Sequence, residues 1–307
     1  MENKKEKITL DREILLESIC KDIIWGGERL SAEFGKGEGS VKRIAETWEL
    51  TARRDGMNKV DGGEYSGTEL SEFEGIENFP LLVKLIDAKE SLSLQVHPDD
   101  EYALKNGNDL GKTEMWYIVD ALPGAQLVYG LKKDVTVDEF AEALSNDSIS
   151  DTLNYVDVKK GDVFFIPAGC VHAIGAGILI AEIQQSSNIT YRVYDFGRGR
   201  ELHIKNALDV IRPYTGDEID AIRYECADDV SEDLLADCRF FRVEKKLSID
   251  CREIVWNEER FMHALVLSGS GRIGRIDVKA GSSVLIPKGM EKSSLCGDFE
   301  FLLTLVK

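Results

Sequence analysis

The hydrophobic positions of this chain form many short runs rich in valine, isoleucine, leucine and phenylalanine, separated by turns that contain glycine. Examples are LLVKLIDA at 81–88, DVFFIPAG at 162–169 and FLLTLV at 301–306. Short apolar segments at close intervals, bounded by turn residues, are typical of strands in a sandwich or barrel. The pattern therefore predicts a mainly β protein.

Two segments depart from the strand pattern. Residues 10–24 carry apolar side chains at helical spacing with Asp11 near the start, which predicts a short helix. In 136–153, Thr136 and Glu139 fit a capping box, and helical spacing follows them. We therefore expect a helical insertion near residues 134–154.

An internal repeat divides the chain. Residues 161–172 have the sequence GDVFFIPAGCVH, and residues 281–292 have GSSVLIPKGMEK, with the same spacing of glycine, proline and glycine. A second matching piece precedes each copy. The repeat predicts two related β units, an N-terminal domain over 1–220 and a C-terminal domain over 221–307 whose copy of the frame is degenerate. Because the second copy has Lys292 in place of His172, we expect that unit to be a lid or an interface rather than a metal site.

Charge and cysteine content narrow the function classes. The 56 acidic and 38 basic side chains give a net charge of −18, which disfavours binding to nucleic acid or to anionic membranes. No apolar run approaches the length that spans a bilayer. Six cysteines without a CxxC pair, and no secretory signal, predict reduced cysteines and a cytoplasmic protein, either a monomer or a homodimer.

The stretch LSLQVHPDDEY at 92–102 carries the first candidate chemistry. On an extended strand, residues two apart project from the same face, so the side chains of Gln95 and His97 can reach one common point. Two interpretations stay open from this fragment alone. One is a metal site, and the other is a hydrogen-bonded core histidine.

The repeated frame resembles the second motif of the cupin superfamily. Cupins have a first motif with two ligands at i and i+2 and a glutamate, and a second motif with one histidine. The matching positions here are Gln95, His97, Glu114 and His172. Nitrogen and oxygen ligands of this kind suit Zn²⁺, although the neutral amide of Gln95 is the weakest of the four.

A narrower resemblance extends over most of the chain. The stretches WGG at 25–27, LLVKLIDAKESLSLQVHPDD at 81–100, GKTEMWYIVDA at 111–121, IPAGCVHAIGAG at 166–177 and EIQQSSNITYRVYDFGR at 182–198 are similar to type I mannose-6-phosphate isomerases of the short bacterial form. The resemblance implies two cupin-type jelly-roll barrels with a few short helices. It also implies an isomerase that uses one zinc ion per chain to interconvert mannose 6-phosphate and fructose 6-phosphate.

The resemblance points to Arg192 as an essential residue for substrate binding and catalysis. Arg192 also lies among aromatic and β-branched residues on a predicted strand, where a guanidinium calls for an anionic partner. Lys84 lies inside an apolar run, so it either extends to solvent or meets a buried anion. Ser93 shares the face of Gln95 and is a candidate phosphate ligand, or else an ordinary strand serine.

The isomerisation requires a base near the sugar's α-carbon. Lys112, two residues before Glu114, and Glu182, on the strand after His172, are the candidates. Glu182 has a structural alternative, a carboxylate bonded to Arg192, and the residues do not separate these. Two histidines outside the motifs have ordinary interpretations, His203 as a cap or packing partner of the following helix and His263 as part of a ligand-free strand.

Two other functions compete with the isomerase. One is a sugar-phosphate-binding cupin or sensor that has lost turnover, which the complete set of candidate residues argues against. The other is an iron-dependent cupin oxygenase. Such sites usually present an HxH pair, whereas Gln95 replaces one histidine here.

Overall fold

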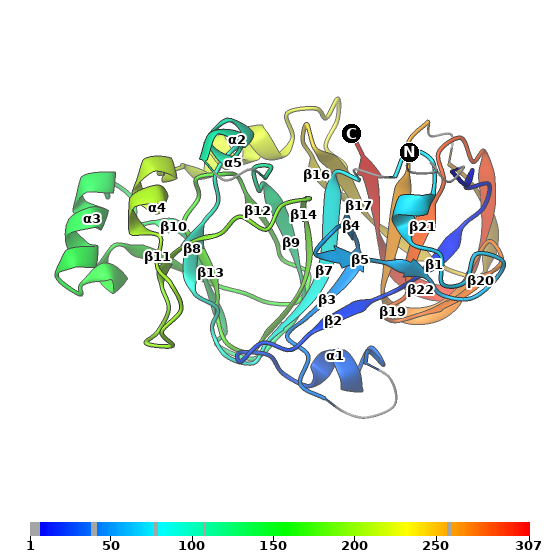
Figure 1. Cartoon of the computed structure of the whole chain (residues 1–307), viewed down its shortest axis with the longest axis horizontal. Coiled ribbons are helices and arrows are strands. Elements are labelled where there is room, and N and C mark those ends of the chain that lie inside the picture. The colour runs from blue at the N-terminus through cyan, green and yellow to red at the C-terminus, as the bar shows by residue number, and fades with distance from the viewer. Residues whose placement is uncertain (1–6, 38–41, 77–78, 107–108, 257–258) are drawn as a thin grey trace, which may run out of the picture.

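The computed structural model describes residues 7–37, 42–76, 79–106, 109–256 and 259–307, and strands predominate in it (Figure 1). The fold is mainly β, as the hydrophobic pattern predicts. The pairs between strands are antiparallel throughout the sheets described below.

Two sheets of the N-terminal part face each other across a shared apolar cluster. The five-stranded sheet has the order β11 (Leu153–Asp157), β10 (Gln126–Leu131), β13 (His172–Ile174), β8 (Leu94–Val96) and β15 (Tyr191–Tyr194). The six-stranded sheet has the order β12 (Val163–Ile166), β9 (Glu114–Ala121), β14 (Ile178–Gln185), β7 (Leu81–Ala88), β3 (Glu46–Leu50) and β2 (Ile19–Lys21). Buried residues of both sheets, such as Leu127 and Ile118, pack in one cluster.

A nine-stranded sheet forms most of the C-terminal part. Its main path is β16 (Leu234–Asp237), β17 (Phe241–Ser248), β22 (Lys292–Val306), β19 (Met262–Ile273), β21 (Ser283–Ile286), β1 (Ile14–Glu17) and β6 (Lys59–Val60). In addition, β18 (Cys251–Val255) pairs with β22, and β20 (Ile276–Lys279) pairs with β19. A short hairpin of β4 (Ala52–Arg53) and β5 (Gly56–Met57) lies apart.

The sequence repeat has a counterpart in the strand order. The run β12-β9-β14-β7 of the six-stranded sheet corresponds to β21-β19-β22-β17 of the nine-stranded sheet. The register agrees as well, because Ile166 lies opposite Glu114 and Ile286 lies opposite Met262. The two copies of the frame therefore occupy equivalent strands.

The six-stranded and nine-stranded sheets pack against each other through a large apolar cluster. Met115 and Tyr117 on β9, and Leu265 and Leu267 on β19, belong to it. The N-terminal strands β1 and β6 belong to the nine-stranded sheet, so residues from both ends of the chain build that sheet. The domain boundary at residue 220 stays a prediction.

Five α-helices are present in the described residues: α1 (Arg29–Ala32), α2 (Asp100–Asn106), α3 (Val137–Ser145), α4 (Ile204–Val210) and α5 (Gly216–Arg223). Two 3-10 turns, η1 (Leu70–Glu72) and η2 (Ile149–Asp151), complete the list. The predicted capping box is confirmed, because Thr136 and Glu139 exchange hydrogen bonds at the start of α3. Since α3 and η2 lie between β10 and β11, the helical insertion is in the predicted place.

The helix predicted over residues 10–24 is wrong. The segment forms β1 and β2 instead. Ile14 and Leu16 are buried while the intervening Leu15 is half-buried, and β1 pairs with β21, about 270 residues later in the sequence, as well as with β6. Pairing with distant strands outweighs local helical spacing here.

The prediction that all six cysteines are reduced is wrong for one pair. Cys251 and Cys296 form a disulfide, because β18 and β22 place these residues directly opposite each other. Their separation of 45 residues carries no local signal. The other four cysteines, Cys20, Cys170, Cys226 and Cys238, are free thiols.

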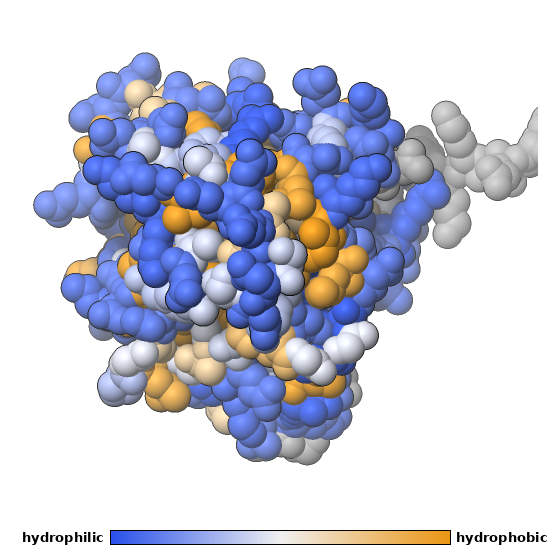
Figure 2. Space-filling view, turned by 90° about the vertical axis from the view of Figure 1, so that its left-hand side faces the viewer, coloured by the Kyte–Doolittle hydropathy of each residue, from blue (hydrophilic) through white to orange (hydrophobic). Residues whose placement is uncertain are grey.

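Among the described residues, no helix is both long enough and apolar enough to cross a membrane. Hydrophilic side chains cover most of the face on the α3 side, and apolar side chains are exposed between them in small groups (Figure 2).

Candidate active site

Three candidate residues lie in one row across the five-stranded sheet. The central strand β8 places Gln95 directly opposite His172 on β13 and directly opposite Arg192 on β15. Because neighbouring strands are about 4.8 Å apart, this row spans roughly 10 Å. The register therefore aligns the histidine of the second motif, the amide of the first motif and the guanidinium.

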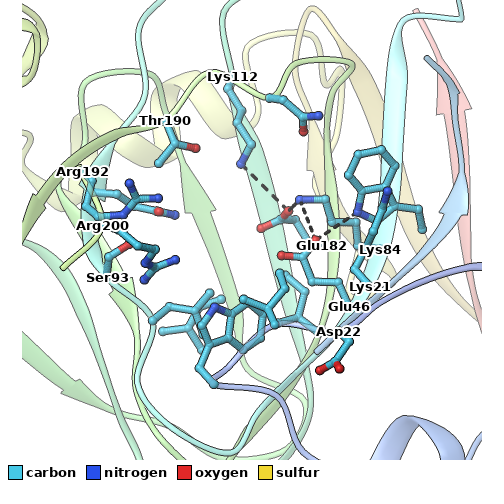
Figure 3. A pocket seen from close by; sticks show the side chains of 18 of the residues that line it. Lys21, Asp22, Glu46, Lys84, Ser93, Lys112, Glu182, Thr190, Arg192 and Arg200 are labelled. Carbon is cyan, nitrogen blue, oxygen red and sulfur yellow. Dashed lines mark hydrogen bonds and ion pairs between the residues drawn. The ribbon is translucent and has the colours of Figure 1, made fainter. Parts of the chain in front are cut away.

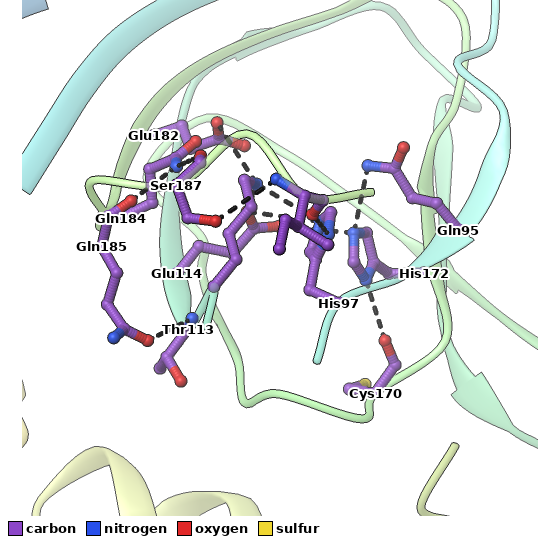
Figure 4. Close-up of polar contacts among 12 residues, drawn as sticks. Gln95, His97, Thr113, Glu114, Cys170, His172, Glu182, Gln184, Gln185 and Ser187 are labelled. Atoms are coloured by element: carbon purple, nitrogen blue, oxygen red, sulfur yellow. Dashed lines mark hydrogen bonds and ion pairs between the residues drawn. The ribbon is translucent and has the colours of Figure 1, made fainter. Parts of the chain in front are cut away.

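The predicted metal ligands converge. One ligand atom each from His97, Glu114 and His172 lies within 4.8 Å of the others, and all three residues are buried (Figure 4). His172 comes from the five-stranded sheet, His97 directly follows β8, and Glu114 begins β9 of the opposite sheet. Among the described residues, these three side chains form the group of histidine, cysteine or carboxylate ligands that could hold a metal ion.

Backbone carbonyl groups fix the orientation of both imidazole rings. Nδ1 of His97 lies 2.9 Å from the carbonyl oxygen of Ile189, and Nδ1 of His172 lies 2.9 Å from that of Cys170. Because a carbonyl oxygen accepts a hydrogen bond, each Nδ1 carries the proton and each Nε2 keeps its lone pair. Burial lowers the pKa of His172 to about 4 and lowers that of His97 well below its usual value. Both rings are neutral at pH 7, as metal binding requires.

Glu114 supplies the oxygen of the group. Its Oε1 lies 3.4 Å from Nε2 of His172 and has no hydrogen-bond partner, although the residue is fully buried. Burial raises the pKa of Glu114 to about 7 against the opposing effect of Lys112, whose ammonium contacts the carboxylate. A buried carboxylate oxygen without a partner costs free energy, and a cation would remove that cost.

These observations fit a divalent cation such as zinc. Two imidazole nitrogens and a carboxylate oxygen form a usual protein set for this ion. The ammonium of Lys112 lies 3.2 Å from Nε2 of His97 and contacts Glu114, so these ligand atoms already interact with one cation. The amide nitrogen of Gln95 lies 3.2 Å from Nε2 of His172, which places the amide beside the same atoms.

Glu182 does not bond Arg192, so its predicted structural alternative is wrong. It lies on β14 opposite Lys84 of β7, and their charged groups are 3.0 Å apart. Nε1 of Trp116 donates a hydrogen bond of 2.9 Å to the other carboxylate oxygen. Burial alone would raise the pKa of Glu182, but the ammonium groups of Lys112 and Lys84 outweigh burial and lower it to about 2.

Lys84 meets a buried anion rather than solvent. Besides Glu182, its ammonium lies 3.7 Å from Glu46. Burial would lower the pKa of Lys84, but the two carboxylates outweigh burial and raise it. The side chains of Glu114, Lys112, Glu182, Lys84 and Glu46 thus alternate in charge from the metal group toward the edge of β3.

A cleft of about 630 Å³ lies beside these charged side chains. Figure 3 shows Arg192, Arg200 and Ser93 on one side and Lys84, Glu46 and Lys21 on the other. Nε of Arg192 donates to the hydroxyl of Ser93 at 3.2 Å, and its Nη1 donates to a backbone carbonyl of the following loop. All predicted substrate and catalytic residues line this cleft, together with the candidate metal ligand Gln95: Lys84, Ser93, Lys112, Glu182 and Arg192.

The sequence interpretation missed several cleft residues. Arg200 extends into the cleft from the loop after β15, where Asp195 pairs with it. Glu46 and Trp48 line the opposite side from β3. The only sequence signal for Arg200 was its position shortly after Arg192. The contribution of β3 to the cleft depends on the pairing of β3 with β7.

The two remaining histidines lie outside the metal group. His203 precedes α4 at its N-cap position without a side-chain cap, and its Nδ1 accepts from the backbone N–H of Arg192. His263 is fully buried on β19, with Nε2 at 2.8 Å from the hydroxyl of Ser283. The prediction that neither belongs to the metal site is in agreement with these positions.

The fold and this donor set define a mainly β protein with a buried histidine–glutamate group that could hold a metal ion, beside a cleft lined by charged side chains of both signs. A family model described as phosphomannose isomerase type I, catalytic domain, matches residues 14–121. The mannose-6-phosphate isomerase ManA of Bacillus subtilis (strain 168) is 35% identical over 313 residues, covering 95% of this chain and 98% of that protein. The mannose-6-phosphate isomerase of Streptococcus mutans is 34% identical over 94% of this chain and 96% of that protein.

A solved structure of mannose 6-phosphate isomerase from Bacillus subtilis superposes with a TM-score of 0.84 at 29% identity, covering 96% of this chain and 99% of that one. The chain belongs to the type I phosphomannose isomerase family. The family predicted from the motifs is therefore confirmed. The names of these relatives support isomerase function.

Proposed function

We propose that this protein is a zinc-dependent isomerase that interconverts mannose 6-phosphate and fructose 6-phosphate. The observation that carries the proposal is the convergence of His97, Glu114 and His172 on one point. Gln95 and Lys112, which contact this group, line a cleft that also presents Arg192. A pure binding protein would need the cleft with Arg192 but not the buried ligand group. The family membership supports turnover as well.

Zinc is the proposed metal, with one ion per chain. Nε2 of His97, Nε2 of His172 and the carboxylate of Glu114 would hold it, and the amide oxygen of Gln95 would join them after rotation of the amide group. When bound, zinc supplies Lewis acidity to the oxygens of the open-chain sugar.

Arg192 is proposed to bind the substrate as an anion ligand. Its guanidinium lies in the same row as Gln95 and points into the cleft, with Ser93 beside it. Burial lowers the pKa of Arg192 from its usual value, but a guanidinium keeps its charge at all pH values of interest. Together with Lys84, it would hold the phosphorylated sugar in the cleft beside Gln95 and Lys112, which contact the metal group.

The reaction moves one hydrogen between C2 and C1 and one proton between the two oxygens, so it needs no external oxidant or reductant. The base takes a proton from one carbon and returns it to the other. Lys112 and Glu182 are the candidates, since both line the cleft beside the metal group. Lys84 and Trp116 hold Glu182 in place, and the low pKa of Glu182 keeps it ionised at neutral pH.

Finer features of the architecture belong to the same proposal. We infer two cupin-type jelly-roll barrels, with a catalytic unit over 1–220 and a degenerate unit over 221–307. The net charge of −18 supports the absence of nucleic-acid partners. A cytoplasmic location and a monomer or homodimer remain part of the proposal.

The test is isomerase activity on mannose 6-phosphate, measured through coupled detection of fructose 6-phosphate with and without a chelator. We expect chelation, His97→Ala and Arg192→Ala each to reduce turnover nearly to background, and zinc to restore the chelated wild type. Metal analysis separates zinc from iron. Full activity in His97→Ala would remove the metal-site assignment, and binding of the sugar without turnover in the zinc-loaded wild type would favour a sensor.

A further inference from the structure

Arg53 joins three segments next to the cleft, whose lining includes its partner Asp55 and Asn188. It lies on β4, and its side chain is 16% exposed. Its Nε and Nη2 donate to the carboxylate of Asp55 at 2.9 and 3.3 Å, and its Nη1 and Nη2 donate to that of Asp109 at 3.2 and 3.1 Å. Nη1 also donates to the carbonyl oxygen of Ser186 at 2.6 Å. All three nitrogens of the guanidinium are therefore bonded, and two of them reach groups from distant parts of the chain.

The segments joined by Arg53 are also bonded to each other. The backbone N–H of Asn188 donates to Asp109 at 3.2 Å, and the hydroxyl of Ser187 donates to the carbonyl oxygen of Leu110 at 2.6 Å. Asn188 in turn donates through its side chain to Asp55 of the β4–β5 hairpin. These bonds tie residues 186–189 to residues 109–110, and Arg53 holds both.

Each of the two tied segments leads directly into the metal group. The carbonyl oxygen of Ile189 is the group that fixes the ring of His97. On the other segment, Lys112 and Glu114 follow Asp109 by three and five residues. A displacement of residues 186–189 would move the acceptor of His97, and a displacement of residues 109–112 would move the carboxylate ligand.

We propose that Arg53 is a positioning residue for the metal site, which it supports by clamping residues 109–110 and 186–189 next to the cleft. Arg53 does not contact the ligands, so it acts through Asp109, Ser186 and Ile189. The bidentate geometry matters, because the planar guanidinium presents its donors in a rigid fork and a lysine cannot reproduce it. This inference rests on the metal site in the proposed function.

Groups that orient metal ligands from outside typically change metal affinity 10–100-fold when they are removed. We expect Arg53→Ala to weaken zinc binding by about tenfold or more. The matched control is Arg54→Ala, which removes the same charge from the neighbouring exposed side chain. The control should keep the wild-type affinity.

The experiment measures the zinc dissociation constant of the whole protein by competition with a chromophoric chelator, and the visible spectrum of the cobalt(II)-loaded protein. Circular dichroism and thermal unfolding establish that each variant is folded. The inference is supported by weaker zinc binding and an altered cobalt spectrum in folded Arg53→Ala, together with wild-type values in Arg54→Ala. Folded Arg53→Ala with wild-type zinc affinity and spectrum would overturn it.

If Arg53→Ala does not fold, Asp109→Asn decides the question in the same way, since it weakens the same clamp while changing a single partly exposed side chain. Arg53→Lys provides a further check and should bind zinc more weakly than the wild type, because it keeps the charge but loses the fork. Failure of the proposed function has a different signature. In that case the wild type binds no zinc, or His97→Ala binds it equally well.

Discussion

The two copies of the repeated frame occupy equivalent strands but present opposite chemistry. Glu114 on β9 lies opposite Ile166, and Met262 on β19 lies opposite Ile286, so the glutamate and the methionine are at equivalent positions. By the same register, Glu182 corresponds to Leu303. In the second copy these positions belong to an apolar cluster with Trp256, Phe299 and Phe301.

The comparison shows that this strand arrangement forms with or without the charged residues of the site. The same strand order contains buried charged side chains in the first copy, such as Glu114, Glu182 and Lys84, and a hydrophobic core in the second copy. The architecture therefore does not require the charges, since buried ionic groups rarely stabilise a fold better than well-packed apolar groups. In the proposed function, these charged residues serve the chemistry of the site.

The largest effect on activity is expected when the glutamate of the first copy is replaced by the methionine of the second. Glu114→Met should lower kcat/KM by about 10³-fold or more, because the lost ligand removes several kcal/mol of metal-dependent stabilisation of the transition state. Zinc binding should fall in parallel. Isomerase kinetics and metal analysis check this prediction, and a variant with near wild-type turnover and a full zinc complement would contradict it.

The reverse exchange tests the second copy. Met262→Glu should destabilise the protein by about 3–5 kcal/mol, because it buries a carboxylate among apolar side chains with no cation beside it. It should create no second metal site. Denaturant unfolding compares it with Ser268→Glu, an exposed position on the same strand, which should change the stability little.

A third exchange concerns the ion pair of Lys84 and Glu182. Lys84→Met should cost about 3 kcal/mol of folding free energy, since it leaves Glu182 as a buried carboxylate without its closest cation. The double variant Lys84→Met with Glu182→Leu should be more stable than the single variant, as the apolar second copy indicates. A double variant with additive losses in a double-mutant cycle would argue against this account.

The most gradual effect is a dependence of stability on pH. Burial lowers the pKa of His263 to about 3, whereas the unfolded chain has its usual value of about 6.5. Between these values the unfolded state binds a proton that the folded state does not. Stability is therefore fully present above pH 6.5 and is lost as the pH falls, by at most about 1.4 kcal/mol per pH unit from this group.

His263→Gln should make that loss shallower, because the amide does not titrate and can still bond the hydroxyl of Ser283. Unfolding free energies of both proteins at several pH values between 4 and 7 measure the difference. Identical slopes would show that His263 does not remain neutral in the folded protein.

The candidate metal ligands could be predicted because the motifs that contain them are local. Gln95 and His97 share a strand face by their spacing, and His172 closes a turn that recurs at residues 281–292. The repeat also identified the strands whose order the two copies share. Those patterns depend on backbone periodicity and turn geometry, which short segments already determine.

What could not be predicted depends on long-range pairing. Residues 14–17 have apolar spacing that also suits a helix, but they pair with β21 at the other end of the chain. The disulfide of Cys251 and Cys296 follows from the register of β18 on β22. Likewise, Glu46 reaches the cleft only because β3 pairs with β7. None of these contacts has a signature within its own segment.

The central claim is that one metal ion is held between the two facing sheets by His97, Glu114 and His172. The most direct measurement is an anomalous difference map from crystals of the zinc-loaded active enzyme, recorded on both sides of the zinc absorption edge. The account predicts a single strong peak per chain at bonding distance from the two Nε2 atoms and the carboxylate of Glu114. A peak bound elsewhere, or an active enzyme with no peak at these residues, would contradict it.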